Sequence, residues 1–385
     1  MRRVLQFLGN AFRRCDKILL LLCLVTTVFG YLVIASTTQV LGSARYVPIQ
    51  IIATVLGVLL FAIVSSIDAD FLSEHRLALV IFNTVLLLMI IPFGTDNGTG
   101  NKSWLSFPFL PIDIQPAEIC KITYILIMAS VMASHQNRPS HISSVMHMVL
   151  HLLLLLGLNM VVSRDAGVSL IFVFIFIGMA FAGGVSLIWF IIAAGGIVAA
   201  FPLLWNVVFS EYQRARIEVL FNPDLDPNGI GVRHQTVRAL RSLTGGGLFG
   251  QGLFEGTRTQ TPEALYAQHT DYIFAAIGEE LGYLGCALVL LLLVLIIARC
   301  IWVGVRSQDY MRRLICFGAA AALIFQVISN VGMCIGITPV IGLTLPFISY
   351  GGSSLVSLYA MLGLVSGVFA RPAPTSHERY IRPHY

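Results

Sequence analysis

Charged residues are scarce in this sequence: Asp, Glu, Lys and Arg make up 11% of its 385 residues, against about 25% in soluble globular domains. Hydrophobic residues make up 57%. This shortage of charge excludes a chain built mainly of soluble domains. It predicts an all-α polytopic membrane protein, in which length counts membrane spans rather than globular domains.

Cysteine pairs and a cleavable leader are missing as well. The seven cysteines, at positions 15, 23, 120, 286, 300, 316 and 334, form no C-x-x-C pair, which argues against a disulfide framework and a zinc site. His147 and His151 are four residues apart, but no third ligand is near, so we interpret them as core or interface histidines. No small-residue cleavage site follows the first apolar run, which is therefore predicted to be a retained span.

Ten apolar runs are long enough, or nearly so, to cross a bilayer, which takes about 20 residues. They cover 18–36, 48–66, 77–93, 116–134, 145–162, 167–182, 185–209, 271–298, 314–335 and 350–370. We predict about ten transmembrane helices in a single integral membrane domain, 1–385, with a large extracytoplasmic loop at 210–270 between spans 7 and 8. An even number of spans puts both termini on one side of the membrane.

Basic residues are distributed unevenly between the two sides of this topology. The side with the termini holds Arg2, Arg3, Arg13, Arg14, Lys17, Arg76, Arg138, Arg299, Arg306, Arg312, Arg313, Arg371, Arg379 and Arg382. The short loops of the opposite side hold Arg45, Lys102 and Arg164. Because Lys and Arg are enriched in cytoplasmic loops, we predict that both termini are cytoplasmic.

The loop at 210–270 is the longest segment between spans, and loops of roughly this length are usually functional or disordered. It contains Arg214 and Arg216, followed by a basic amphipathic stretch that would suit anionic headgroups or a pyrophosphate. The Gly-rich run at 245–252 could offer backbone amides to phosphate, but we favour a flexible connection.

Two further outer segments carry polar or aromatic residues. In the first, Trp104 is typical of an interfacial anchor, while Glu118 and Lys121 share a helix face and can pair. The alternative for these two is a snorkelling pair at a helix end. The second segment, 338–354, contains two prolines and three glycines and is predicted to be irregular backbone beside protein or a polar cavity.

The stretch 267–285 carries three acids into an apolar run. Asp271 stands at its start, and Glu279 and Glu280 follow 8 and 9 residues later, which in a continuous helix is roughly 12–13 Å deeper. Ionisable groups at that depth usually face a polar interior. At about 100° per residue, Glu279 faces nearer the side of Asp271 and is predicted to neighbour a cavity, whereas Glu280 is predicted to pair with another helix.

Six segments carry extended motifs, at 115–121, 165–167, 214–223, 246–252, 269–285 and 339–354. The longest are HTDYIFAAIGEELGYLG and P-x-x-G-L-T-L-P-F-I-S-Y-G-G-S-S, the last two of the six. Together they resemble the SEDS family (RodA, FtsW and SpoVE) through nearly the whole chain. The sequence departs from the family at Ser163-Arg164, where Gln-Pro is usual, and at 266–268, where Leu-Pro-Glu is typical.

The resemblance implies a peptidoglycan glycosyltransferase that polymerises lipid II. In such a reaction a general base activates the 4-hydroxyl of the acceptor sugar, the anomeric carbon is inverted, and undecaprenyl pyrophosphate leaves. The resemblance marks Asp271 as that base. Its alternative role is a helix cap, since an acid at a helix start complements the dipole.

The other site residues follow from motif positions and from the charge of pyrophosphate. Arg216, Arg214 and Lys121 are candidates for the phosphates, with Glu118 orienting Lys121 and with headgroup contact as the alternative for Arg214. Further substrate-binding candidates are Trp104, Gln115, Asp165, His269, Glu279, Ser349, Tyr350, Gly351 and Ser353. A purely structural role is the alternative for the last four. A divalent cation, Mg²⁺ or Mn²⁺, bridging Asp271 and pyrophosphate is compatible with these residues, although the sequence predicts no metal-ligand cluster.

The resemblance also implies a location and partners: the bacterial cytoplasmic membrane, lipid II, membrane lipid and a class B penicillin-binding protein that supplies the transpeptidase, with no nucleic acid. Gly256-Thr257 and the 339–354 motif mix elongation-type and division-type features, of which we favour the RodA type. The main alternative is a lipid II flippase or transporter, because intramembrane acids also suit proton coupling. No inverted repeat of the usual transporter kind is evident. A membrane scaffold without catalysis is a third alternative.

Overall fold

The computed structural model describes residues 9–371 except 10, 69–70, 72–73, 97–101, 108–111, 204, 207–208 and 228. The terminal arginines used in the orientation argument, Arg2, Arg3, Arg379 and Arg382, lie outside the described residues.

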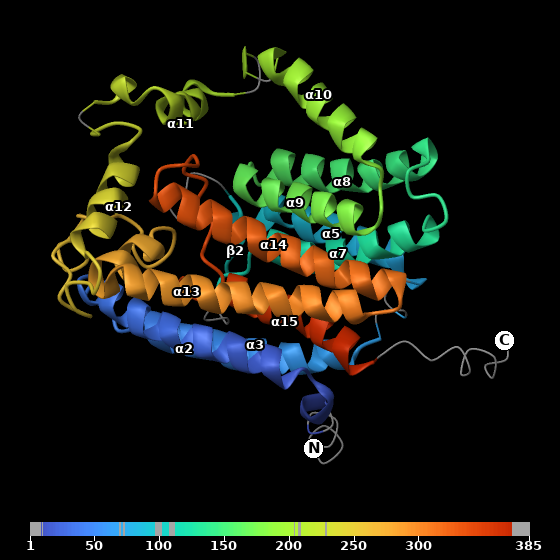
Figure 1. The fold of residues 1–385 in the computed structure, drawn as a ribbon, viewed down its shortest axis with the longest axis horizontal. Helices are drawn as coiled ribbons and strands as arrows, with labels where there is room; N and C mark the ends of the chain where they lie inside the picture. Colours follow the sequence, from blue (N-terminus) through green and yellow to red (C-terminus); the bar gives the residue numbers. More distant parts are fainter. Residues whose placement is uncertain are drawn as a thin grey trace.

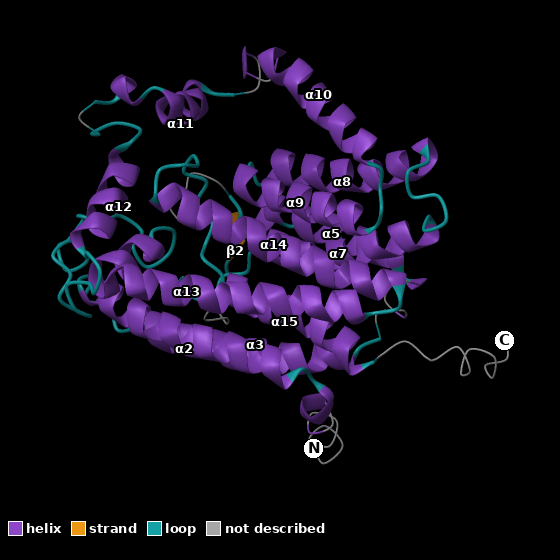
Figure 2. Ribbon diagram, viewed as in Figure 1, coloured by secondary structure: helices purple, strands orange, loops and turns teal. Residues whose placement is uncertain are grey.

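The regular secondary structure of the described residues is helical apart from one short pair of strands, and loops join these elements (Figure 2). Its apolar helices are α2 (Lys17–Gln39), α3 (Tyr46–Ser66), α5 (Arg76–Leu88) continued by α6 (Ile90–Phe93), α7 (Pro116–Ser134), α8 (Ile142–Val162), α9 (Ala166–Ala182), α10 (Leu187–Leu203), α13 (Ile273–Arg306), α14 (Tyr310–Cys334) and α15 (Gly352–Ala370). Eight of these spans are long and apolar enough to cross a membrane, while α9 and α10 are shorter apolar helices of 17 residues. The prediction of a polytopic helical membrane protein is confirmed.

The remaining elements lie in the connections between these helices. Strands β1 (Gly94–Thr95) and β2 (Trp104–Leu105) pair antiparallel. The long loop after α10 contains α11 (Glu211–Phe221), a 3-10 turn (Pro223–Leu225) and α12 (His234–Gly245). This loop therefore has secondary structure of its own.

Helix α15 packs closely along α3, and small residues make this possible. A Cβ atom added to Gly363 would lie 2.8 Å from the Phe61 carbonyl oxygen, and one added to Gly57 would lie 2.7 Å from the Tyr359 ring. Small residues at such contacts let helix backbones approach, which is how helices associate in lipid. The pair forms one side of the bundle with α2 and α13, and α5, α7, α8 and α9 lie on the other side (Figure 1).

Two ends of the bundle can be distinguished by their contacts. At one, Asp16 before α2 bonds to Arg299 late in α13, and the Arg371 guanidinium after α15 bonds to the Ser66 carbonyl at the end of α3. We call this the Asp16 end. The opposite end, the Asp271 end, carries α12 and the start of α13 (Figure 1). The first spanning helix begins and the last one ends at the Asp16 end, as an even number of spans requires.

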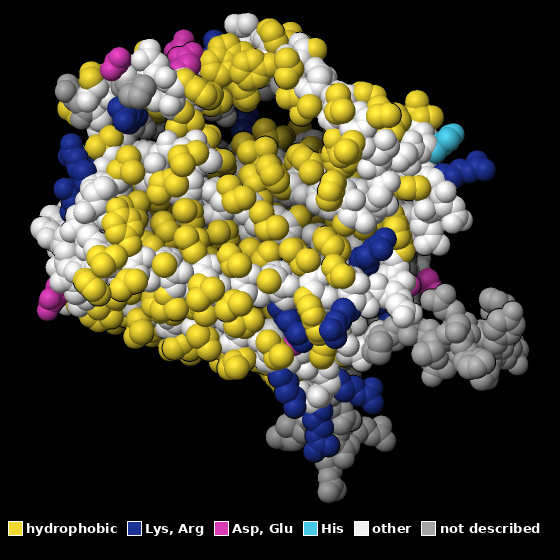
Figure 3. All heavy atoms as spheres, in the orientation of Figure 1, with side chains coloured by type: hydrophobic (Ala, Val, Ile, Leu, Met, Phe, Trp, Pro, Cys, Tyr) yellow, Lys and Arg dark blue, Asp and Glu magenta, His cyan; other side chains and the backbone are white. Residues whose placement is uncertain are grey.

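Helix α10 differs from the other apolar helices because none of its residues is buried. It diverges from the bundle, and α11 continues the chain along the same edge of the molecule (Figure 1). Figure 3 shows a hollow between this edge and the main bundle, with hydrophobic side chains on its floor.

Helix α13 is neither as early nor as continuous as predicted. It begins at Ile273 rather than at Asp271, and Gly282 interrupts it with φ 66° and ψ −167°. That left-handed φ is accessible to glycine at little steric cost. The predicted depth of Glu279 and Glu280 assumed a regular helix from Asp271, which is wrong.

The Gly-rich segment 246–252 packs against this helix break. Four backbone hydrogen bonds join the segment to residues 279–284: Gln251 N to Glu279 O (2.9 Å), Gly252 N to Glu280 O (3.0 Å), Tyr283 N to Gly247 O (3.0 Å) and Leu284 N to Leu248 O (3.2 Å). These bonds satisfy backbone groups that a broken helix leaves without partners. The flexible connection favoured from sequence is wrong, and the amides of Gln251 and Gly252 are already bonded to carbonyls rather than open to phosphate.

Candidate active site at the Asp271 end

Asp271 lies in the turn that precedes α13, and this turn is held by the segment 338–351. Three successive carbonyl oxygens of the turn accept hydrogen bonds from outside it: His269 O from Tyr350 N (2.9 Å), Thr270 O from Ser349 Oγ (2.6 Å) and Asp271 O from Asn330 Nδ2 (2.8 Å). The backbone of the candidate base is thus anchored at three consecutive positions.

The Asp271 side chain is not a helix cap. The residue that caps α13 is Tyr272, and no side-chain capping bond is present there. The Asp271 carboxylate instead lies against the 338–351 segment, because a Cβ atom added to Gly342 would be 3.4 Å from its Oδ2 atom. The capping alternative is therefore wrong.

The pKa of Asp271 is raised towards neutral pH. Burial, as the larger cause, and the nearby Asp165 carboxylate together raise the pKa of its carboxyl to about 6. Both causes disfavour the charged form. A carboxylate with a pKa near the working pH is what a general base requires.

Asp165 is the N-cap residue of α9 and lies at the same end of the bundle as Asp271. Its Oδ1 atom accepts a hydrogen bond from Val168 N at 3.0 Å, and its Oδ2 atom accepts one from Gln115 Nε2 at 3.3 Å. Burial is the largest cause that raises the pKa of Asp165, and the Glu118 carboxylate adds to it, while the bond from Val168 N opposes it. Asp165 and Gln115, both predicted site residues, are thus in contact.

Glu118 and Lys121 form a buried ion pair on α7. The Lys121 Nζ atom lies 2.7 Å from Glu118 Oε2, and their side chains are 2% and 5% exposed. Ser357 Oγ donates a hydrogen bond to the same Glu118 oxygen at 2.6 Å. The predicted pairing is confirmed, whereas the snorkelling alternative is wrong because neither group reaches the surface.

The two candidate arginines on α11 face different partners. Arg216 Nη1 donates to Val340 O at 2.9 Å, which brings this guanidinium to the 338–351 segment beside Asp271. Arg214 donates to Phe209 O and Asn206 O, just upstream on its own stretch of chain. Of the two, Arg216 is the one that the structure brings to the site.

Several predicted substrate-binding groups in the 338–354 motif are used in internal contacts. Ser349 Oγ bonds to Thr270 O, and it also accepts a hydrogen bond from Leu345 N at 2.8 Å. Ser353 Oγ accepts from Gln115 N at 3.0 Å. Gly351 N donates to Gln50 Oε1 at 3.2 Å. These contacts favour the structural alternative for Ser349, Ser353 and Gly351.

An aromatic cluster adjoins the turn. The ring centroid of Tyr46, at the start of α3, lies 4.9 Å from that of His269 and 4.9 Å from that of Tyr350. Burial lowers the pKa of His269, so the imidazole is neutral at pH 7. Tyr46 was not predicted. The signal available for it is a tyrosine at the start of an apolar run.

Glu279, Glu280 and Trp104 have their observed contacts with residues other than Asp271. The Glu279 carboxylate is fully buried and accepts hydrogen bonds from the backbone N–H groups of Arg258 and Thr259, so its predicted place beside Asp271 is not observed. Glu280 accepts from Ser36 Oγ of α2 at 2.7 Å, which matches its predicted pairing with another helix. Trp104 lies on β2, where its carbonyl accepts from Thr95 Oγ1 at 3.1 Å.

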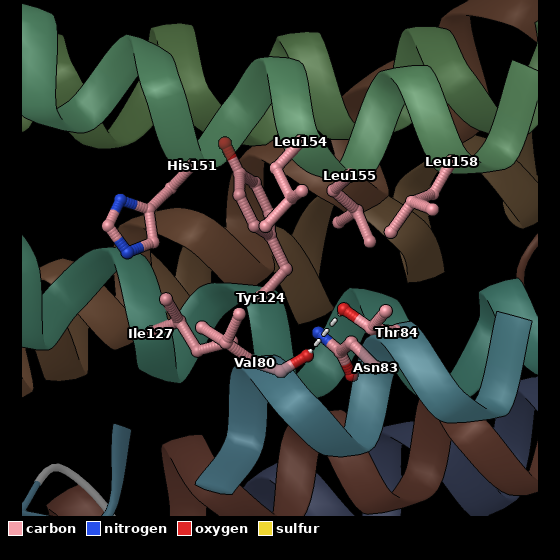
Figure 4. A pocket seen from close by; sticks show the side chains of 9 residues that line it. All are labelled: Val80, Asn83, Thr84, Tyr124, Ile127, His151, Leu154, Leu155 and Leu158. Carbon is pink, nitrogen blue, oxygen red and sulfur yellow. Dashed lines mark hydrogen bonds between the residues drawn. The ribbon is translucent and has the colours of Figure 1, made fainter. Parts of the chain in front are cut away.

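A separate, partly open pocket lies between α5, α7 and α8. It is lined by Val80, Asn83, Thr84, Tyr124, Ile127, His151, Leu154, Leu155 and Leu158 (Figure 4). No predicted catalytic or substrate-binding residue contributes to this lining. The candidate site is therefore the surface around Asp271 rather than this pocket.

Metal binding at the site is limited to a few oxygen ligands. Among the described residues, no group of three or more His, Cys, Asp or Glu side chains is arranged to hold a metal ion. Asp271 and Asp165 are two carboxylates close enough to interact. Mg²⁺ is commonly bound through one or two carboxylates together with substrate phosphates, so these two residues fit that ion.

The sequence resembles a known family model and curated relatives over most of its length. The family model described as "Cell cycle protein", that of FtsW, RodA and SpoVE, matches residues 14–371. A probable peptidoglycan glycosyltransferase FtsW of Trichlorobacter lovleyi is 32% identical over 96% of this chain and 98% of its own length. Peptidoglycan glycosyltransferase MrdB of Escherichia coli is 32% identical over 92% of this chain and 93% of its own.

Solved structures share the fold. A chain in the structure titled "Structural coordination of polymerization and crosslinking by a peptidoglycan synthase complex" has a TM-score of 0.75 and 26% identity, covering 96% of this chain and 99% of that one. The rod shape determining protein RodA of Thermus thermophilus has a TM-score of 0.67 and 24% identity, covering 94% and 98%. On the family model and the curated relatives, this chain belongs to the FtsW/RodA/SpoVE family.

Proposed function

We propose that this protein is a peptidoglycan glycosyltransferase that polymerises lipid II, with Asp271 as its general base. The observation that carries the proposal is the Asp271 carboxyl, anchored by its backbone and with its pKa raised to about 6. Curated relatives that match nearly the whole chain are named as peptidoglycan glycosyltransferases, which supports the same reaction.

In the proposed reaction, the Asp271 carboxylate takes the proton of the acceptor 4-hydroxyl as its oxygen attacks the anomeric carbon of the donor. The new C–O bond forms as the bond to pyrophosphate breaks, and undecaprenyl pyrophosphate leaves as an anion. Because this leaving group needs no proton, a second carboxylic acid is unnecessary. A divalent cation held by Asp165 and Asp271 would supply charge neutralisation at the pyrophosphate.

Positive charge for the leaving group would come from Arg216, whose guanidinium bonds to the 338–351 segment beside Asp271. Lys121 is buried against Glu118, so we assign it a supporting role through Asp165, whose pKa its charge lowers. The hydrophobic floor of the hollow beside α10 and α11 would suit the isoprenoid chain (Figure 3).

The proposal extends to the cellular setting. The chain would lie in the bacterial cytoplasmic membrane as one integral domain, with both termini in the cytoplasm and the 210–270 loop outside. It would act with a class B penicillin-binding protein, an assignment supported by the fold shared with a chain of a peptidoglycan synthase complex. A RodA-type role in elongation is our preference from the sequence motifs; curated relatives include both FtsW and MrdB.

The test is polymerisation by the purified protein with its cognate class B penicillin-binding protein and lipid II. Glycan length on a gel and undecaprenyl pyrophosphate release would be measured for wild type and for Asp271→Asn, with thermal unfolding as the fold check. Removal of a general base is expected to lower the rate by about 10²–10⁴-fold. Polymer from both proteins would remove Asp271 as the base, and unchanged lipid II moved across a vesicle membrane would identify a flippase instead.

A further inference from the structure

Asn330 lies near the C-terminal end of the membrane helix α14, and its side chain is completely buried. Its Nδ2 atom donates two hydrogen bonds, to Asp271 O at 2.8 Å and to Leu343 O at 2.7 Å. These carbonyls belong to the two separate segments, 267–272 and 338–351, that form the candidate site. One buried amide therefore joins both segments to the bundle.

We propose that Asn330 is a positioning residue for Asp271: its amide holds the Asp271 backbone against the 338–351 segment and thereby aims the carboxylate at the acceptor hydroxyl. The proposal rests on the proposed glycosyltransferase function. Neither amide hydrogen bond reaches the Asp271 side chain, so Asn330 acts on the reaction through geometry alone.

The bonding of the amide distinguishes this role from general helix packing. Both hydrogen bonds of the Asn330 side chain use its nitrogen, and its Oδ1 atom has no hydrogen-bond partner among the described residues. Burying the Asn330 Oδ1 atom without a partner costs free energy. The two bonds donated by the Nδ2 atom are therefore the interactions that this residue contributes. Without the amide, Leu343 O would lose this donor and Asp271 O would keep only the weak thiol donor Cys334 Sγ, at 3.9 Å. The turn and the loop would then be loosened at Asp271, while the bonds at His269 and Thr270 remain.

Asp165 is held in the same way by a second buried asparagine. Asn159 Nδ2 donates to Asp165 O at 3.0 Å and to Ser169 Oγ at 2.8 Å. Each of the two interacting acids thus has its backbone carbonyl fixed by an amide from a membrane helix. This arrangement fixes the backbone positions of two carboxylates that interact electrostatically.

The test compares Asn330→Leu, which keeps similar volume and removes the donors, with Asn83→Leu on α5. Asn83 is also a buried asparagine, it accepts from Thr123 Oγ1, and it lines the pocket between α5, α7 and α8, whose lining contains no candidate site residue. Asn330→Ser, which retains one donor, provides a second variant should the leucine variant fail to fold. Each protein is assayed in its complex with the penicillin-binding protein.

For folded Asn330→Leu, we normalise kcat to the fraction of the protein that binds lipid II. This kcat should fall by about 10–100-fold, as expected when a catalytic group is displaced by about 1 Å, and KM should be nearly unchanged. Asn330→Ser should fall less, and Asn83→Leu should keep wild-type kcat. A structural defect alone would lower the binding-competent fraction and leave kcat per competent protein unchanged. That result, or an equal kcat loss in Asn83→Leu, would overturn the proposal.

Hydrogen–deuterium exchange in nanodiscs provides a second readout that needs no catalysis. Peptides covering 267–272 and 338–351 should exchange faster in Asn330→Leu and not in Asn83→Leu. Unchanged exchange in a folded Asn330→Leu protein would contradict the proposal even if activity fell. Absence of polymer from wild type would contradict the proposed function, and the exchange result would then decide separately whether Asn330 joins the two segments.

Discussion

The two ends of the helix bundle differ in how their acidic residues are paired. At the Asp16 end, the Asp16 carboxylate is bonded by both Nε and Nη2 of Arg299, at 2.8 and 3.1 Å. The guanidinium groups of Arg299 and Arg306 lie 4.2 and 4.1 Å from the centre of the Trp302 ring. Charges there are matched within the protein, and they tie the start of α2 to the end of α13.

At the Asp271 end, the candidate base has a carboxylate of like charge as a neighbour. No described residue forms an ion pair with Asp271, and the charged group that perturbs it is another acid, Asp165. The Arg216 guanidinium donates to the backbone carbonyl of Val340. Unfavourable electrostatics maintained by the fold are typical of functional sites. The difference indicates that the Asp16 end stabilises the bundle, whereas the Asp271 end has the electrostatics expected of the proposed site.

The Glu118–Lys121 pair is the exception at the Asp271 end, and breaking it should have the largest effect. Lys121→Met leaves the buried Glu118 carboxylate without its cation, which costs about 3–5 kcal/mol of folding free energy. We expect a strongly lowered thermal midpoint and loss of polymer, measured by thermal unfolding and the glycan gel.

The double variant Glu118→Gln/Lys121→Met separates stability from activity. Removing both charges is expected to restore most of the thermal midpoint, because a neutral buried pair has little desolvation penalty. Activity should stay low, since the charges around Asp165 are then changed. A double variant with wild-type activity would show that the pair serves folding alone.

Gly250→Ala tests how far the Asp271 end depends on the Gly-rich segment. A Cβ atom at Gly250 would lie 2.1 Å from Glu280 O, and the residue has φ of 84°, so the segment would have to leave the helix break. Gly247 has a similar positive φ of 57° with no atom within 4 Å of an added Cβ, which makes Gly247→Ala the matched control. We expect a loss of about 1–2 kcal/mol in the control, from backbone strain alone, and clearly more in Gly250→Ala, measured by thermal unfolding. Equal losses would contradict the packing account.

This segment shows where prediction from the sequence ended. The apolar runs identified the membrane helices because burial in lipid needs long stretches without charge. The spacing of Glu118 and Lys121 identified their pairing because both lie on one helix face. The contact between 246–252 and 279–284 had no local signal, since backbone hydrogen bonds between distant segments do not depend on side-chain type.

The site was predicted to a similar extent. Asp271 and Asp165 were named from their motifs, and the structure brings them close enough to interact. Asn330 and Gln50 were missed because a single polar residue in an apolar helix does not indicate which backbone group it will bond. Glu279 was misplaced because the angle assigned to it assumed that Asp271 belongs to α13, which begins two residues later.

The pH dependence of polymerisation is a finer test of the charges at the Asp271 end. With a pKa of about 6, Asp271 loses its base form as pH falls through 6, so kcat/KM should drop about tenfold for each pH unit below that. An ordinary Asp, with a pKa of about 3.9, would keep full activity to about pH 5. Asp165→Asn removes one charge that raises the pKa, and so should move this acidic limb to lower pH. If the acidic limb of the Asp165→Asn variant stays at the wild-type pH, Asp165 is not a cause of the raised pKa of Asp271.

The smallest expected effect on activity comes from the Asp16 end. Asp16→Asn retains a good helix cap for α2, because the asparagine oxygen can still accept from Leu19 N, but it removes the charge that Arg299 binds. Losing these charge-assisted bonds should lower the folding free energy by about 1.5–3 kcal/mol, seen as a lower thermal midpoint. At temperatures where the variant is folded, kcat and the acidic limb should match wild type, because no Asp271-end contact is altered. A fall in kcat would show that the Asp16 end also controls the geometry around Asp271, and the division of roles between the two ends would no longer hold.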